Sequence, residues 1–160
     1  MSRLENKKET IEVATRFHEI WREGRKTYNG SYEPKWKKIR KDLNFIESAI
    51  PSKTVRISEE GVEVDIANTD FMDLPFDYQE ENLLAAEVVV NLLKNKKALT
   101  IYEIEQFSSV VHDEWLKRNT WAKGGNLDAP YNMLPEEEKA KDRIQVITGM
   151  EAMRISRRTR

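Results

Sequence analysis

The strongest constraint on the fold is an internal repetition that includes both histidines of the chain. The segment Phe17-His18-Glu19-Ile20-Trp21 matches Val111-His112-Asp113-Glu114-Trp115. In each segment the histidine follows an apolar residue, directly precedes an acidic residue and lies three residues before a tryptophan. Apolar residues at three- and four-residue steps surround both segments, so both are expected to be helical. The two tryptophans are expected in the core.

A second pair of landmarks follows in the same order. Leu74-Pro75 lies ahead of Asn82, and Leu134-Pro135 lies ahead of Asp142; in both cases the short polar residue comes seven positions after the proline. Because proline is accepted in the first turn of a helix, each Leu-Pro pair predicts a helix start. The shared order predicts a mainly α fold in which two pseudo-symmetric repeats pack together, each burying the apolar face that the other leaves exposed.

The expected organisation is a single compact unit over residues 1–160. A degenerate first repeat spans 5–97 and contains an inserted helix and β-hairpin at 31–66. The second repeat spans 100–153. The segment 154–160, with four arginines, is expected to be a basic flexible tail, and an arm that binds phosphate or a partner is the alternative.

Local patterns predict the individual elements. Thr100 and Glu103 form a capping box that opens a helix, and alternating apolar residues on both sides of a turn predict a small β-hairpin over 54–66. The other expected helices cover 5–27, 34–49, Pro75 to Leu93, and a stretch that starts near Pro135.

Composition narrows the functional classes. The chain has no cysteine, which excludes thiolate nucleophiles, thiolate metal sites and disulfides and favours a cytoplasmic location. No apolar run approaches the ~20 residues of a membrane span, and the start of the chain lacks the apolar stretch of a signal peptide. With a net charge of −1, neither nucleic acid nor a membrane is an expected partner. A homodimer is compatible with the sequence.

The same landmarks resemble the ryanodine-receptor repeat (RyR domain) family. The resemblance rests on His112-Asp-Glu-Trp115, Trp121, Pro130-Tyr131, Leu134 and the segment Glu138-Lys139-Ala-Lys-Asp142-Arg143, and it covers about residues 104–153. The first half is similar only through His18, Trp21, Leu74 and Asn82. In the ryanodine receptor, a calcium channel, these repeats occur in tandem and are associated with binding an adenine-type nucleotide. The resemblance therefore implies a cytoplasmic binding module with no catalytic residue to carry over.

Seven residues are candidates for binding a ligand, and each also has a structural interpretation. Loop aromatics could stack on a ring, while the acidic, basic and amide side chains could bind polar groups or simply close the fold. Arg143 could present its planar fork to an anion such as a phosphate, or it and Asp142 could pair with loop residues to close the fold. His112 could bind a phosphate or a backbone carbonyl. The candidates are Trp121, Tyr131, His112, Asp142, Arg143, Gln79 and Asn82.

The expected function is a non-catalytic module that binds a nucleotide-like or nucleotide-derived molecule in a cleft between the repeats, for sensing or sequestration. No catalytic or metal-binding residue is expected, since the sequence has no glycine-rich phosphate loop, serine-centred elbow or zinc signature. No cofactor is expected. The alternative is a scaffold or protein–protein interaction domain without a small-molecule ligand.

Overall fold

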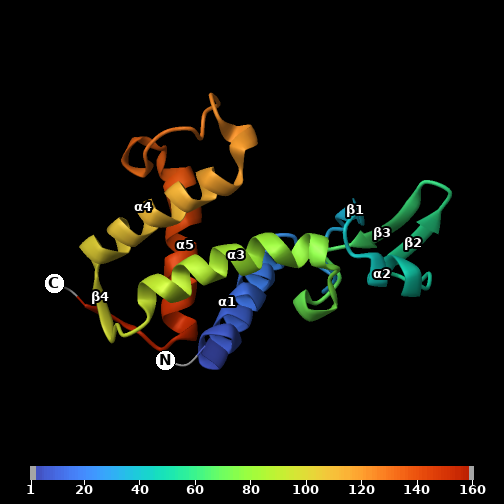
Figure 1. The fold of residues 1–160 in the computed structure, drawn as a ribbon, viewed down its shortest axis with the longest axis horizontal. Helices are drawn as coiled ribbons and strands as arrows, with labels where there is room; N and C mark the ends of the chain where they lie inside the picture. The colour runs from blue at the N-terminus through green and yellow to red at the C-terminus, as the bar shows by residue number, and fades with distance from the viewer. Residues whose placement is uncertain (1–2, 159–160) are drawn as a thin grey trace. The chain divides into compact units, whose positions relative to one another are not determined.

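The computed structural model describes residues 3–158 and is mainly helical, as predicted, with two small β-sheets (Figure 1). The chain divides into two compact units. Within the described residues, unit 1 comprises 3–13 and 83–158, and unit 2 comprises 14–82. Helices α1 (Arg3–Glu23) and α3 (Phe76–Leu93) each contribute residues to both units.

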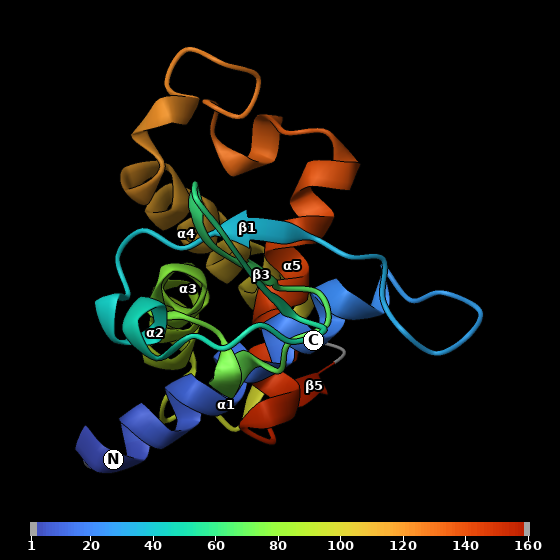
Figure 2. The same ribbon diagram turned by 90° about the vertical axis from the view of Figure 1, so that its right-hand side faces the viewer.

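Unit 2 contains a three-stranded antiparallel sheet in the order β1-β3-β2. Its strands are β1 (Trp36–Lys38), β2 (Val55–Ser58) and β3 (Gly61–Asp65). Strands β2 and β3 form the predicted hairpin, and the pair Ser58–Gly61 closes its turn. The short helix α2 (Leu43–Ser48) packs against the sheet (Figure 2), where Ile39, Val62 and Val64 form a core with flanking apolar side chains that include Phe45 and Ile46.

The prediction of one helix over 34–49 is wrong, because strand β1 and the turn after it replace most of that helix. Residues 36–38 pair with β3. The backbone N–H groups of Arg40, Lys41 and Asp42 then donate to the carboxylate of Asp77, each at 2.9 Å. Asp42 in turn caps α2 by accepting from the N–H of Phe45. Tertiary partners therefore satisfy the backbone groups that a helix would have paired internally.

Unit 1 is built on α4 (Ile101–Arg118) and α5 (Glu136–Ala152), with the C-terminal part of α3. Helix α4 begins with the predicted capping box of Thr100 and Glu103. Two 3₁₀ turns, η2 (Thr120–Ala122) and η3 (Tyr131–Met133), lie in the connection to α5. The centre of the unit includes the buried side chains Val89, Val90, Leu93, Ile104, Val111, Val146 and Met150.

The basic segment at the end of the chain is partly ordered where a flexible tail was expected. Ser156–Arg158 forms strand β5, which pairs in parallel with β4 (Ala98–Thr100). Ile155, just before β5, is buried and its N–H donates to the carbonyl of Met150 at 2.8 Å. These backbone bonds hold the segment on unit 1, while residues 159–160 lie outside the described residues.

In unit 2, the η1 turn (Phe71–Asp73) precedes Leu74-Pro75 and the start of α3. The indole of Trp21 is 39% exposed, so the expectation of a core tryptophan there is wrong. His18 and Arg22 of the same helix take the buried positions, at 3% and 7% exposure. The Arg22 guanidinium is bonded to the carbonyl of Ala67 at 2.8 Å and to the carboxylate of Asp70 at 2.9 Å, which offsets the cost of its burial.

Candidate functional site

The candidate site in unit 1 begins with the buried pair His112 and Asp142. His112 of α4 is 3% exposed and Asp142 of α5 is 8% exposed. The Nε2 of His112 lies 2.8 Å from the carbonyl oxygen of Ala129. Because a carbonyl only accepts, Nε2 must carry the proton and donate. The other ring nitrogen, Nδ1, lies 3.5 Å from Oδ2 of Asp142. The ring is therefore fixed in orientation and tautomer, with Nδ1 directed at the carboxyl group.

These two residues line a pocket of about 230 Å³ that lies wholly within unit 1. Apolar side chains and the half-buried Trp115 form part of its wall, and the ion pair between Lys141 and Glu138, 3.1 Å apart, forms another part. The full lining is His112, Trp115, Leu127, Leu134, Glu138, Lys141, Asp142 and Gln145. An apolar wall with a few convergent polar groups is the usual composition of a small-ligand site.

Two polar groups of this wall stand out, one by its pKa and one by its missing hydrogen bond. Burial raises the pKa of Asp142 from 3.8 to about 6, against the opposing effect of His112, so this carboxyl can accept or donate a hydrogen bond near neutral pH. The Oε1 of Gln145 is buried and has no hydrogen-bond partner among the described residues. Leaving such a group unpaired costs about 1–3 kcal/mol. Both side chains lie on α5, three residues apart, and both residues line the pocket.

The predicted stacking residue Trp121 lies beside the pocket wall and is not part of its lining. Its side chain is 74% exposed and meets Trp115 edge to face, with 5.6 Å between the ring centroids. The indole N–H donates to Oδ1 of Asn119 at 3.1 Å. Trp115, which we expected in the core, is the tryptophan that the pocket uses.

Tyr131 and Arg143 belong to a separate ionic cluster in unit 1. The Tyr131 hydroxyl donates to Oε2 of Glu105 at 3.0 Å and accepts from Nε of Arg143 at 2.9 Å. Arg143 donates to both carboxylate oxygens of Glu105, at 2.8 and 2.9 Å, and to Glu136 at 2.9 Å. These bonds lower the pKa of Glu105 and raise that of Arg143. The guanidinium fork is thus occupied by two carboxylates, and both lie on helices rather than in the loop.

Gln79 and Asn82 belong to unit 2. The side-chain amide of Gln79 donates to the carbonyl of Phe71 at 2.9 Å and so anchors the η1 turn. Asn82 is half-buried on α3. Of the seven candidates, the structure brings only His112 and Asp142 together in one pocket, with Trp121 against its wall. Gln145 was missed, although its position one helical turn after Asp142 could have indicated it.

His18 has a local environment that parallels that of His112. Its Nε2 donates to the carbonyl of Thr69 at 2.7 Å, and both acceptor carbonyls lie five residues before the leucine of a Leu-Pro pair. Each ring stacks on the tryptophan three residues later, at 5.8 Å for Trp21 and 6.2 Å for Trp115. Burial lowers the pKa of His18. The duplication of the two halves remains a prediction that these parallel contacts favour.

Comparison with known proteins identifies no relative: no family model matches the chain, and neither the curated proteins nor the solved structures include a match. The resemblance to the ryanodine-receptor repeat therefore remains a prediction. Among residues 3–158, no helix combines the length and the apolar character needed to cross a membrane. The same residues contain no group of three or more His, Asp or Glu side chains placed to hold a metal ion.

Proposed function

We propose that unit 1 is a non-catalytic binding module whose pocket accepts the base of a nucleotide-like or nucleotide-derived molecule. The observation that carries the proposal is the combination of one aromatic wall, Trp115, with the buried carboxyl of Asp142, whose pKa is raised to about 6, and the unpartnered Oε1 of Gln145. A sensing or sequestering role would follow from binding alone.

The apolar part of the pocket suits a flat ring. Trp115 can stack on one face of a base, and Leu127 and Leu134 provide the apolar surface around it. Stacking of a base on an aromatic side chain contributes about 1–3 kcal/mol where it has been measured by alanine substitution. The edge-to-face contact with Trp121 would hold the Trp115 ring in place.

The polar part of the pocket sets the hydrogen-bonding requirement. The Gln145 Oε1 is an acceptor, and Asp142 is one when it is ionised, so a ligand with N–H donors fits these groups best. A small rotation of the Gln145 amide would allow its oxygen to meet such a donor. Guanine offers adjacent ring and amino N–H groups, and adenine and cytosine each offer an amino group. Uracil has one ring N–H between two carbonyls and is the poorest match.

Size limits what the pocket can enclose. A volume of about 230 Å³ is smaller than the ≈ 300–1,000 Å³ of pockets that hold drug-sized ligands. Only the base would be enclosed, and the sugar and phosphates would lie outside it. Lys141, whose side chain is 72% exposed, is the pocket cation that could meet them. Arg143 is not required in this proposal, because carboxylates already occupy its fork.

A protein-interaction role has one supporting observation. A groove of about 440 Å³ runs between α3 and α4 of unit 1, and Leu84 and Val110 of its lining are 42% and 36% exposed. Exposed apolar side chains beside a groove are typical of interaction surfaces. This alternative predicts a partner protein and no small-molecule ligand.

A thermal-shift panel on the full chain tests the proposal. The ligands are adenosine, guanosine, cytidine and uridine, followed by ATP, ADP-ribose, cyclic ADP-ribose isomers and cyclic oligonucleotides. A ligand at 100 times its dissociation constant adds about 2.7 kcal/mol of stability, which corresponds to a rise in Tm of roughly 5–10 °C for a chain of this length. Amino-bearing bases should produce the rise and uridine should produce less.

Two matched variants locate the site. Asp142→Asn changes the carboxyl in the pocket, whereas Asp113→Asn makes the same chemical change at an exposed neighbour of His112. The shift should change in the first variant and persist in the second. If no compound raises Tm, or if both variants respond as the wild type does, the pocket is not a base-binding site. A partner protein recovered in that case would favour the interaction role.

A further inference from the structure

Unit 2 contains a dense run of positively charged residues. The net charge of the whole chain, which is close to zero, does not reveal this run. Residues 35–41 read Lys-Trp-Lys-Lys-Ile-Arg-Lys, which places five cations and no acid in seven positions, although the net charge of the chain is −1. We name these five cations the β1 basic strip: Lys35, Lys37, Lys38, Arg40 and Lys41.

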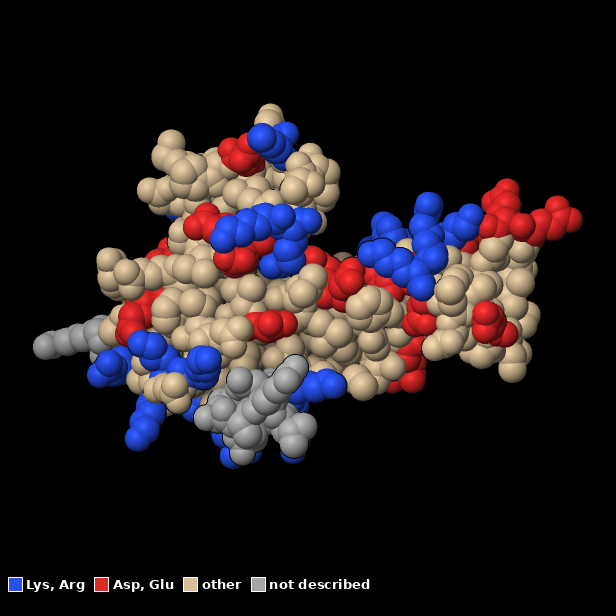
Figure 3. Space-filling model, in the orientation of Figure 1, with Lys and Arg blue, Asp and Glu red and all other residues tan. Residues whose placement is uncertain are grey.

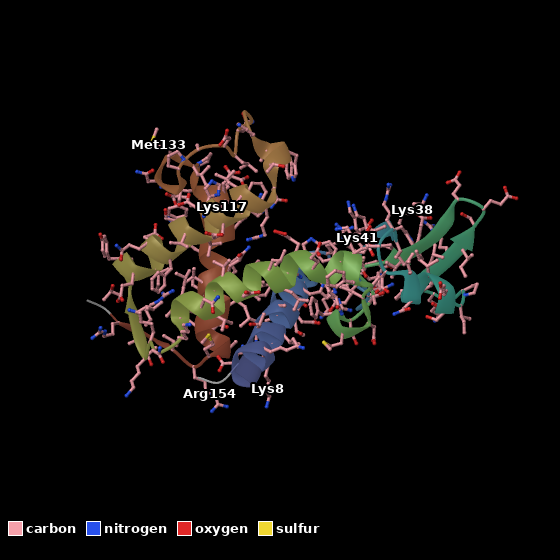
Figure 4. All side chains as sticks on the ribbon, viewed as in Figure 1. Lys8, Lys38, Lys41, Lys117, Met133 and Arg154 are labelled. Atoms are coloured by element: carbon pink, nitrogen blue, oxygen red, sulfur yellow. The ribbon has the colours of Figure 1, made fainter. Side chains whose placement is uncertain are left out.

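The structure exposes four of these five cations along an edge of the sheet, and Lys37 is half-buried. Strand β1 pairs only with β3, so it is an edge strand of the sheet. Figure 3 shows Lys and Arg side chains gathered over the part of unit 2 that carries β1, and Figure 4 labels Lys38 and Lys41 there. The side chains of Lys35, Lys38 and Arg40 are exposed and form no ion pair with the described residues. Lys41 pairs with Glu80 at 3.2 Å but stays 65% exposed.

Lysine on an edge strand has a common structural role, which is to prevent pairing with a second chain. That role does not account for the whole strip. Strand β1 is only three residues long, and the cations continue beyond both of its ends. The N–H groups of Lys35, Arg40 and Lys41 already donate to Asp65 and Asp77, each at 2.9 Å. These three positions therefore offer no free N–H group to another strand. Their positive charges are not needed to prevent pairing with a second chain.

We propose that the β1 basic strip binds the phosphate backbone of a nucleic acid without sequence preference. The argument is one of charge density. Six residue steps of extended chain span at most about 20 Å, so the strip carries roughly one cation per 4 Å. A nucleic acid strand carries one negative charge per 3.4 Å of helix axis, which is a similar density of charge. An acidic protein segment would need an uninterrupted run of carboxylates to do the same. This site is separate from the base-binding pocket of unit 1.

The test is the salt dependence of binding to a fluorescein-labelled 20-nucleotide single strand, followed by fluorescence anisotropy with the full chain. Five phosphate contacts predict a slope of log K against log salt of about −3.5, or a loss of roughly 100-fold in affinity between 50 and 200 mM salt. A variant that lacks three of the cations should show a slope of about −1.4. That variant is Lys35→Gln/Lys38→Gln/Arg40→Gln. The matched control removes three exposed lysines of unit 1: Lys94→Gln/Lys97→Gln/Lys123→Gln.

Three results would overturn the proposal. The wild-type chain fails to bind the strand or its duplex form at 50 mM salt; the strip variant keeps the wild-type slope; or poly-glutamate of equal charge competes as well as unlabelled strand, which would make an acidic protein the partner. If the triple variant does not fold by circular dichroism, Arg40→Gln alone should still reduce the slope by about 0.7. An unchanged slope in that variant would count against the proposal equally.

Discussion

Replacing Asp142 by asparagine tests the electrostatics on which the candidate site depends. The substitution keeps the shape of the side chain and removes its titration. Asp142 is 8% exposed, and its neighbours in the pocket include the apolar side chains of Trp115 and Leu134 as well as His112. Burial raises its pKa in the folded protein from the ordinary 3.8 to about 6. The unfolded chain has no such environment, so the two states bind protons differently at this position.

The sign and size of the effect follow from that difference. Between pH 3.8 and about 6 the folded state holds more protons at Asp142 than the unfolded state does, so the free energy of unfolding falls as the pH rises through this window. Two pKa units at 1.36 kcal/mol each amount to about 3 kcal/mol in total. This contribution to the free energy of unfolding is fully present below the pKa that Asp142 has in the unfolded chain, and it is lost above the pKa that Asp142 has in the folded protein. About 2 kcal/mol of the loss falls between pH 4.5 and 7.5.

Urea unfolding of the wild type and Asp142→Asn at pH 4.5, 6.0 and 7.5 measures this directly. Because asparagine does not titrate, the variant should gain about 2 kcal/mol on the wild type from the lowest to the highest pH. Asp113→Asn makes the same substitution at an exposed position of α4 and is the control. A difference between wild type and Asp142→Asn that stays constant with pH would refute the account of Asp142.

Three further substitutions test other contacts within unit 1. In Gly149→Ala the new Cβ would lie 2.2 Å from Cγ1 of Val89, so overpacking should lower the free energy of unfolding by about 1–3 kcal/mol; a net gain in urea titrations, as alanine gives in an open helix, would contradict this. Thr100→Ala removes the capping box of α4 and should cost about 1 kcal/mol, and an unchanged thermal melt by circular dichroism would count against that role. Arg143→Lys breaks the two-point pair with Glu105 and should lower Tm while leaving the ligand-induced thermal shift intact; a lost shift would place Arg143 in the binding site.

Elements fixed by local chemistry were predictable from the sequence. The capping box of Thr100 and Glu103 and the β2–β3 hairpin depend on residues close in the chain, and both are confirmed. The helix over 34–49 failed for the opposite reason. Its apolar positions suit a helix, but the free edge of β3 and the carboxylate of Asp77, more than 20 residues away, take over the backbone hydrogen bonds.

The candidate site shows the same difference between what nearby residues determine and what distant residues determine. Asp142 and His112 were identified from the repeated motif, and the structure places them together. From the sequence alone, Arg143 could have bound a phosphate. In the structure, its guanidinium group is bonded to Glu105 of another helix. Trp115 was assigned to the core because it lies beside an apolar stripe. Only the fold reveals that the buried His112 leaves the indole at the pocket wall.

The most direct test of the base-binding proposal is to follow the four tryptophan indole N–H signals of the ¹⁵N-labelled chain during titration with guanosine, adenosine or cytidine. Each indole reports a different place: Trp21 beside His18, Trp36 under Arg56, Trp115 in the pocket wall and Trp121 against it. Binding in the pocket predicts a saturable shift of the Trp115 signal, with a smaller one at Trp121, and no change at Trp21 or Trp36. A Trp115 signal that stays in place at millimolar nucleoside, or a shift confined to Trp21 or Trp36, would contradict the proposed site.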